Sequence, residues 1–282
     1  MTDYIDYSFT TDNIPEGKRK ILYVNTVNPV QESTIQASAA AAPGSVWYVL
    51  GEPNGRGIPV ESVLAGLHDT YQVIKDADPT ALITSPSILN FNFTCIGCGG
   101  FQSGAEWIAI FRDQYLSTYG EEPPIDIWAI DVFPIIWPVD GDVEAAFPNT
   151  RSDIVIAQIE AYREWIDSIE ASEGKPIWIT EFGLHWGFSD WVPDSPSCPG
   201  PLPAGEYETD AVRQYLSEVY TWLEENSDAL NIERWFTFSS YRDIDSCQAD
   251  SGNGLSLLDS IGIDGQLTEI GGFFLEWVKG SP

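Results

Sequence analysis

The sequence predicts an α/β protein built as a (β/α)8 barrel of the TIM type. Three observations lead to this fold class. Short apolar runs alternate with amphipathic helical segments along the chain. The runs are apolar at nearly every position rather than at every second one, as expected for parallel strands buried on both faces. No glycine-rich phosphate loop follows any run, which disfavours a doubly wound nucleotide-binding sheet.

The strands are expected in the apolar runs. In chain order these are Lys20–Asn25, Ser45–Leu50, Ala81–Ser85, Ile125–Phe133, Pro176–Thr180 and Arg234–Ser239. A closed barrel has about eight strands, and the segment before Lys20 is too short to supply two more. We therefore expect about six strand–helix units and a barrel that is incomplete at its N-terminus.

Helices are expected between these runs. The first follows Ile58, and the second begins at Ser103, where Glu106 three residues later completes a capping box. Apolar residues at helical spacing mark two more, over 155–169 and 212–223. No internal repeat or linker interrupts the pattern, so we expect a single domain over residues 1–282.

Composition excludes several classes of function. The chain has 13 basic and 43 acidic residues, a net charge of −30, which disfavours binding to nucleic acid or to anionic membranes. It contains no run of 18 apolar residues, so no membrane-spanning segment is expected. The acidic surface would keep the protein soluble at high salt or low pH. An ordinary acidic secreted protein can have the same excess of carboxylates without any such adaptation.

The four cysteines are Cys95, Cys98, Cys198 and Cys247. An even number in a methionine-poor chain indicates an oxidising compartment, so we expect an extracellular or cell-surface protein, although residues 1–11 show no signal peptide. Disulfides between Cys95 and Cys98 and between Cys198 and Cys247 are one arrangement. A zinc site made of all four thiolates is another.

Two apolar runs each deliver a glutamate to their carboxyl end. The run that ends at Leu50 is followed by Gly51 and Glu52, and the run that ends at Thr180 is followed by Glu181. Loops at that end of a parallel barrel converge on the active site. Two carboxyl groups that face each other there are the catalytic groups that a glycosidase needs, because one acts as an acid and the other as a nucleophile.

These residues carry a family resemblance. Val-Trp-Tyr-Val-Leu-Gly-Glu52-Pro-Asn resembles the fourth-strand acid/base motif of the clan A glycoside hydrolases, and Pro-Ile-Trp-Ile-Thr-Glu181-Phe-Gly resembles their seventh-strand nucleophile motif. From about Lys20 onward the chain is most similar to the short-barrel "catalytic core" group, which includes endo-β-1,3-glucanases. The resemblance implies a retaining endo-glycosidase acting on a β-linked polysaccharide or oligosaccharide, with Glu52 as acid/base, Glu181 as nucleophile and no cofactor or metal.

The chain departs from the clan pattern in three ways. Gly51 stands where the clan has an asparagine, Asp131 and Phe133 occupy the strand that carries a tyrosine or histidine, and the first two strands are missing or unrecognisable. These departures keep a second hypothesis open, a non-hydrolytic glycan-binding protein on a degenerate barrel. A structural or surface protein with an acidic shell is a third hypothesis.

Further polar and aromatic residues follow the strands and are expected to contact the sugar, since indole and phenol rings stack on sugars and amides bond their hydroxyls. They are Asn54, Asn90, Phe133, Trp137, His185, Trp186 and Tyr241. The sequence gives no indication of the oligomeric state.

Overall fold

The computed structural model describes residues 3–8, 14–25, 32–93, 102–135, 150–184, 209–238, 257–259 and 265–280. Two compact units divide the chain. The first comprises Met1–Asp131, Gln158–Thr180 and Ser227–Trp235, and the second comprises Val132–Ala157, Glu181–Asn226 and Phe236–Pro282. Because the two units alternate along the chain, the expectation of one domain over residues 1–282 stays a prediction.

Four strands form the first sheet, in the order β1-β2-β3-β4. They are β1 (Asp3–Ile5), β2 (Arg19–Val24), β3 (Val46–Val49) and β4 (Leu82–Ile83), and each pairs in parallel with its neighbour. The β2 and β3 strands are buried at nearly every position, which explains their continuously apolar sequence.

A second sheet has the order β5-β6-β7-β8. Its strands are β5 (Ile88–Leu89), β6 (Trp128–Val132), β7 (Ile177–Phe182) and β8 (Ile232–Thr237). The segment 82–89 joins the two sheets, because Thr84 bridges to Ile127 beside β6 while Ser87 bridges to Gly51 after β3. The predicted α/β fold with parallel strands is confirmed.

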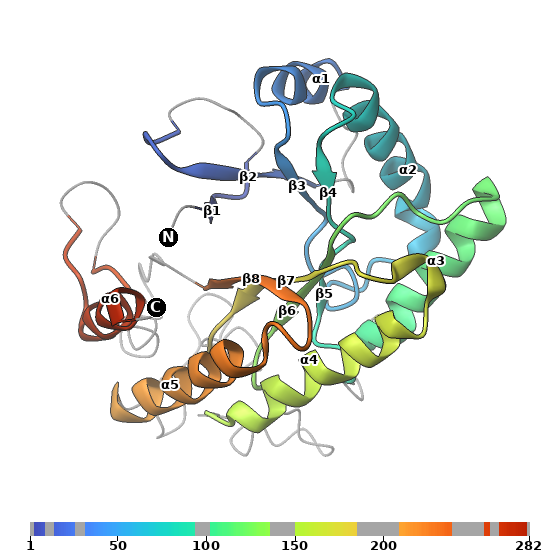
Figure 1. Cartoon of the computed structure of the whole chain (residues 1–282). Coiled ribbons are helices and arrows are strands. Elements are labelled where there is room, and N and C mark those ends of the chain that lie inside the picture. The colour runs from blue at the N-terminus through green and yellow to red at the C-terminus, as the bar shows by residue number, and fades with distance from the viewer. Residues whose placement is uncertain are drawn as a thin grey trace, which may run out of the picture. The chain divides into compact units, whose positions relative to one another are not determined.

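Three helices of the first unit lie on the outer side of its strands (Figure 1). They are α1 (Glu32–Ala41), α2 (Val60–Ala77) and α3 (Gly104–Tyr119). The α3 helix begins as predicted, since the hydroxyl of Ser103 accepts a hydrogen bond of 3.1 Å from the amide of Glu106. The next elements along the chain are α4 (Ser152–Asp167) and the short 3-10 helix η2 (Glu170–Ser172).

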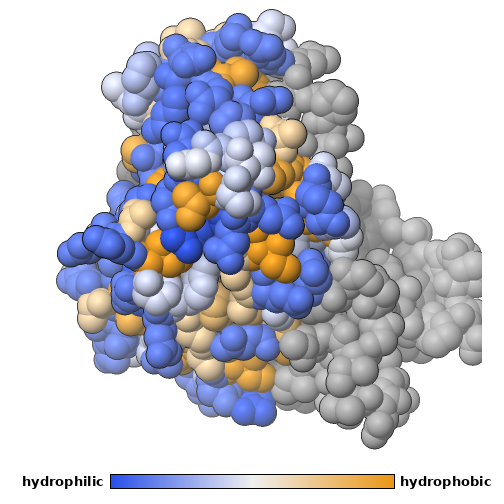
Figure 2. All heavy atoms as spheres, turned by 90° about the vertical axis from the view of Figure 1, so that its right-hand side faces the viewer, coloured by the Kyte–Doolittle hydropathy of each residue, from blue (hydrophilic) through white to orange (hydrophobic). Residues whose placement is uncertain are grey.

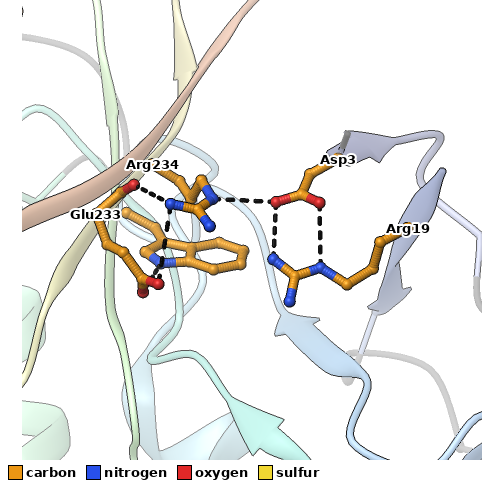
Figure 3. A network of polar contacts seen from close by, with 5 residues as sticks. Asp3, Arg19, Glu233 and Arg234 are labelled. Atoms are coloured by element: carbon orange, nitrogen blue, oxygen red, sulfur yellow. Dashed lines mark hydrogen bonds and ion pairs between the residues drawn. The ribbon is translucent and has the colours of Figure 1, made fainter. Parts of the chain in front are cut away.

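The structure shows one of the two clan strands that the sequence leaves missing or unrecognisable. The β1 strand lies parallel to β2, so one strand precedes the run at Lys20. Asp3 of β1 is almost buried and accepts hydrogen bonds from Arg19 of β2 (2.7 and 3.1 Å) and from Arg234 of β8 (3.0 Å; Figure 3). A single carboxylate therefore joins the first, second and last strands through residues that all belong to the first unit.

The second unit contains α5 (Thr209–Asn226) and α6 (Glu269–Gly280). These helices pack through aromatic rings, with the centroids of Tyr220 and Trp277 5.5 Å apart, and the indole of Trp277 donates a hydrogen bond of 2.9 Å to Glu224. At the base of α6 a side chain on Gly271 would collide with the carbonyl oxygen of Leu257. Gly271 therefore sets the close approach of that loop.

The face over α2 and α3 is mostly hydrophilic, with apolar residues in small separate groups (Figure 2). Such a pattern is normal for a water-exposed surface. None of the helices in the described part of the chain has the length and apolar character needed to cross a membrane.

Candidate active site

Glu52 lies in a strained connection at the carboxyl end of β3. Leu50 and Glu52 both have left-handed backbone conformations, with φ of 55° and 49°. Residues other than glycine adopt this conformation at a cost of about 1–3 kcal/mol, and such residues gather at functional sites. The amide of Glu52 donates to the carbonyl of Ser87 at 2.8 Å, which fixes the glutamate against the segment that links the two sheets.

Because Gly51 has no side chain, it leaves room for the phenol group of Tyr48. A Cβ at this position would stand 2.8 Å from the hydroxyl of Tyr48, which is buried and bonded elsewhere. The asparagine that the clan carries here therefore does not fit unless Tyr48 moves. The departure from the clan pattern at Gly51 therefore goes together with Tyr48 of β3, whose hydroxyl group occupies the space of a side chain at position 51.

Asn54 holds the turn that follows Glu52. Its side chain is fully buried, and its amide donates to the carbonyls of Leu89 (2.9 Å) and Gln102 (3.2 Å). Its carbonyl oxygen accepts from the amide of Leu89 at 2.8 Å. The sequence predicts that Asn54 contacts the sugar, but in this structure its polar atoms bind the backbone of the protein itself.

Asp131 is a fully buried carboxylate on β6. One oxygen accepts a hydrogen bond of 2.6 Å from Thr180 of β7, and the other accepts one of 3.2 Å from Tyr48 of β3. The hydroxyls of Thr180 and Ser87 are 2.7 Å apart. Because a threonine has only one hydroxyl proton, Ser87 donates to Thr180 when Thr180 donates to Asp131.

Asp131 and Glu52 form a pair of like charges. A carboxylate oxygen of Asp131 lies within 4.8 Å of one of Glu52. Burial raises the pKa of Glu52 to about 8, the negative charge of Asp131 adds to the increase, and the guanidinium of Arg56 opposes it. Glu52 therefore keeps its proton at neutral pH, where an ordinary glutamate is ionised.

Glu181 follows Thr180 directly along β7. Thr180 is the last residue of the first unit on this strand, and Glu181 is the first residue of the second. Glu181 is the next residue of β7 after Thr180, which donates to Asp131. The glutamate is partly exposed.

The segment after Glu181 is shaped by a glycine. A Cβ on Gly183 would lie 2.5 Å from the carbonyl oxygen of Phe238, and the amide of Phe238 donates to Phe182 at 2.8 Å. Tyr215 of α5 donates to the carbonyl of Gly183 at 2.9 Å. The Glu-Phe-Gly motif is therefore partly a packing motif, since only glycine allows the chain past β8 to come this close.

The remaining predicted site residues divide into two groups. Asn90 is fully buried with a φ of 46°, and Phe133 is 1% exposed with its ring edge-on to Phe238 at 6.2 Å. Both are buried, so neither presents a sugar-binding surface in this structure. Several predicted residues lie outside the described part of the chain, namely Trp137, His185, Trp186, Tyr241, Cys95, Cys98, Cys198 and Cys247.

The sequence does not single out three residues of the hydrogen-bond network around Asp131, namely Tyr48, Ser87 and Thr180. Each is a hydroxyl-bearing residue in or beside an apolar run, and strand sequences contain many such residues for packing alone. The available signal was Asp131, because an acidic residue in an otherwise apolar, doubly buried run must find hydrogen-bond donors on neighbouring strands.

Comparison with known proteins decides the family. The family model "Glycosyl hydrolase catalytic core" matches residues 65–274, which is well over half of the chain. The chain belongs to this family. The match includes Glu181 and Asp131 and begins after Glu52. Membership confirms the resemblance to the catalytic core group and establishes the chain as a member of a glycoside hydrolase family.

Solved structures share the fold of this glycosyl hydrolase. An endo-β-1,3-glucanase of glycoside hydrolase family 128 from Pseudomonas viridiflava superposes with a TM-score of 0.63 at 18% identity, over 98% of this chain and 89% of that one. An exo-β-1,3-glucanase of the same family from Aureobasidium namibiae gives a TM-score of 0.62 at 12% identity, over 100% and 86% of the two chains.

A third structure contains a ligand. It is a family 128 endo-β-1,3-glucanase from Amycolatopsis mediterranei in complex with laminaritriose, with a TM-score of 0.51 at 16% identity over 90% of this chain and 83% of that one. At these identities the likeness establishes the fold of the glycosyl hydrolase. A comparison with curated proteins finds no match.

Proposed function

We propose that the protein is a retaining, endo-acting β-1,3-glucanase in which Glu52 is the general acid/base and Glu181 is the nucleophile. The observation that carries this proposal is the place of Glu52, in a left-handed connection at the carboxyl end of β3 and within 4.8 Å of the buried Asp131 carboxylate. A general acid must hold its proton at the pH of the reaction. The raised pKa of Glu52, about 8, is the second support.

The two glutamates would act in a double displacement. In the first step the Glu181 carboxylate attacks the anomeric carbon while Glu52 gives its proton to the glycosidic oxygen, and the bond between that oxygen and the anomeric carbon breaks. In the second step the ionised Glu52 takes a proton from water, and the resulting hydroxide displaces Glu181 from the sugar. The proposal requires the two carboxyl groups to stand about 5–5.5 Å apart.

The substrate assignment rests on the fold relatives. Three solved structures with the same fold are named as β-1,3-glucanases, and one of them holds laminaritriose. Both endo- and exo-acting enzymes occur among them, so product size separates the modes. An endo-acting enzyme releases a series of oligosaccharides from laminarin at early times, and an exo-acting one releases a single small product.

One observation favours a second function, non-hydrolytic glycan binding. Phe133 offers no hydroxyl group, and it is buried with its ring edge-on to that of Phe238. A protein of this kind is retarded in a gel that contains β-1,3-glucan but releases no reducing sugar from it. Assays on laminarin, mannan and xylan separate the two functions.

The role of Glu52 is tested by removing its carboxyl group. We expect Glu52→Ala to lose most of its activity on laminarin, about 10²–10⁴-fold, because the leaving sugar then departs without a proton. Activity on an activated aryl glucoside should survive, since that leaving group needs little protonation, and azide should raise the rate by attacking the glycosyl-enzyme. Equal losses on both substrates without azide rescue would refute the assignment.

A further inference from the structure

Asp131 has no role in the double displacement described above, yet it is buried beside the acid/base. We propose that Asp131 is a positioning residue: its buried carboxylate, within 4.8 Å of the carboxyl group of Glu52, sets the state in which the acid/base meets the substrate. The inference rests on the proposed function of Glu52 and adds a third carboxyl group to the site. It also explains why an acidic side chain interrupts the apolar run of β6.

Two hydroxyl groups donate to the carboxyl group of Asp131. Its two oxygens accept hydrogen bonds from Thr180 at 2.6 Å and Tyr48 at 3.2 Å. Donors to a carboxylate stabilise its charge. These two donors are neutral hydroxyls, so they favour the anion and do not themselves cancel its charge.

The same hydrogen bonds tie Asp131 to the strands that carry both glutamates. Tyr48 lies four residues before Glu52 on β3 and its continuation, and Thr180 lies one residue before Glu181 on β7. A shift of either strand would therefore change the distance between Asp131 and Glu52. Because the carboxylate is fully buried, water screens this interaction little.

Other charged groups also act on Glu52. Arg56, in the turn that follows Glu52, opposes the effect of Asp131. Tyr48 is the neighbouring titratable group on β3, and Glu181 follows Thr180 along β7. Desolvation is the largest cause of the raised pKa, so removal of the Asp131 charge should lower it without restoring the ordinary value. We expect a decrease of about 1–2 pKa units for a like charge at this distance.

The test is a direct titration of Glu52 that requires no substrate. Protein labelled with ¹³C at the glutamate carboxyl carbons is followed by NMR from pH 4 to 10, and the Glu52 signal is assigned by its loss in Glu52→Gln. In Asp131→Asn we expect the pKa of Glu52 to fall by about one unit or more. An unchanged titration would overturn the proposal.

Asp126→Asn is the matched control. Asp126 precedes β6 and accepts hydrogen bonds from Lys75 (2.9 Å) and from the amide of Ile83 (2.9 Å), at the opposite end of the same strand. The control removes one carboxylate from the same run, so the titration of Glu52 should not move. Asp131→Ser replaces Asp131→Asn if the amide prevents folding. If neither variant folds, Asp131 is a residue of the fold and the proposal is wrong.

Activity provides a second readout that a purely structural role would not move. In Asp131→Asn the alkaline limb of kcat/KM on laminarin should shift down by the same amount as the titration, so that the loss is about fivefold at pH 8 and small at pH 5. A uniform loss at all pH values would contradict the proposal. A different outcome is also possible: the wild-type protein hydrolyses no β-glucan, but Asp131→Asn still lowers the pKa of Glu52. That result would refute the proposed function and leave the coupling of Asp131 to Glu52 in place.

Discussion

At the scale of single residues, Glu52 is held in a form that an isolated glutamate avoids. Its backbone is left-handed, with a φ of 49°, and its carboxyl group keeps a proton to a pH of about 8. Both features lower the stability of the protein at neutral pH, and both are expected of a group selected for chemistry rather than for folding.

This cost is measurable through the pH dependence of stability. Unfolded Glu52 loses its proton near its ordinary pKa of 4.5, whereas the folded protein keeps it to about 8. Between these values the folded state binds more protons, so the free energy of unfolding falls as the pH rises. Glu52→Gln removes the ionisable group and should therefore gain stability relative to wild type between pH 5 and 8.

We expect the melting temperature of Glu52→Gln to exceed that of wild type by several degrees at pH 8, and by much less at pH 5. Thermal unfolding followed by circular dichroism at both pH values measures the difference. Glu61→Gln, on the exposed face of α2, is the control and should show the same difference at both pH values. A gain for Glu52→Gln that does not depend on pH would mean that Glu52 is already ionised at neutral pH.

The two glutamates could be predicted from the sequence because each stands directly after an apolar run, a local signal. The environment of Glu52 could not. The bond between Tyr48 and Asp131 joins residues 83 positions apart, and the bond between Asp131 and Thr180 joins residues 49 apart. Such pairings depend on the strand order and register, which one sequence does not specify.

At the scale of elements, long periodic segments were predictable and short ones were not. The predicted helix after Ile58 and the capping box at Ser103 appear as α2 and α3. The β1 and β5 strands, of three and two residues, are too short for a periodic signal. The α1 helix is rich in alanine and lacks a strong apolar face, and for this reason its sequence resembles a loop.

The cluster of Asp3, Arg19 and Arg234 shows what the short β1 strand contributes. Asp3 is nearly buried and bonds both arginines, whose side chains are 43% and 42% exposed. We expect Asp3→Asn to lower the free energy of unfolding by about 1–2 kcal/mol, since charge-assisted bonds are lost but the arginines remain hydrated.

Urea unfolding at low salt measures this loss. The control is Asp153→Asn, which breaks a pair with Arg151 in which both side chains are more than half exposed. Its effect should stay below about 0.5 kcal/mol. Equal effects of the two substitutions would show that β1 is not held by this cluster.

At the scale of the whole molecule, the net charge of −30 is the dominant property of the surface. Repulsion among carboxylates opposes the compact state, and salt screens it with a Debye length of about 10 Å at 0.1 M and 3 Å at 1 M. We therefore expect the melting temperature at pH 7 to rise by several degrees as NaCl is increased from 0.02 M to about 1 M. KCl should act equally, because screening depends on ionic strength alone. A melting temperature that does not change with NaCl would mean that the acidic composition is not an adaptation to salt.

The central claim is that this family member hydrolyses its substrate through a covalent bond to Glu181 with retention of configuration. Incubation with an activated 2-fluoro laminaribioside should add the mass of the fluorinated disaccharide to the peptide that contains Glu181, and Glu181→Ala should stay unlabelled. Proton NMR of the first product from laminarin should show the β-anomer, because two successive inversions restore the starting configuration. A label on another carboxylate, or a first product in the α-configuration, would contradict the account.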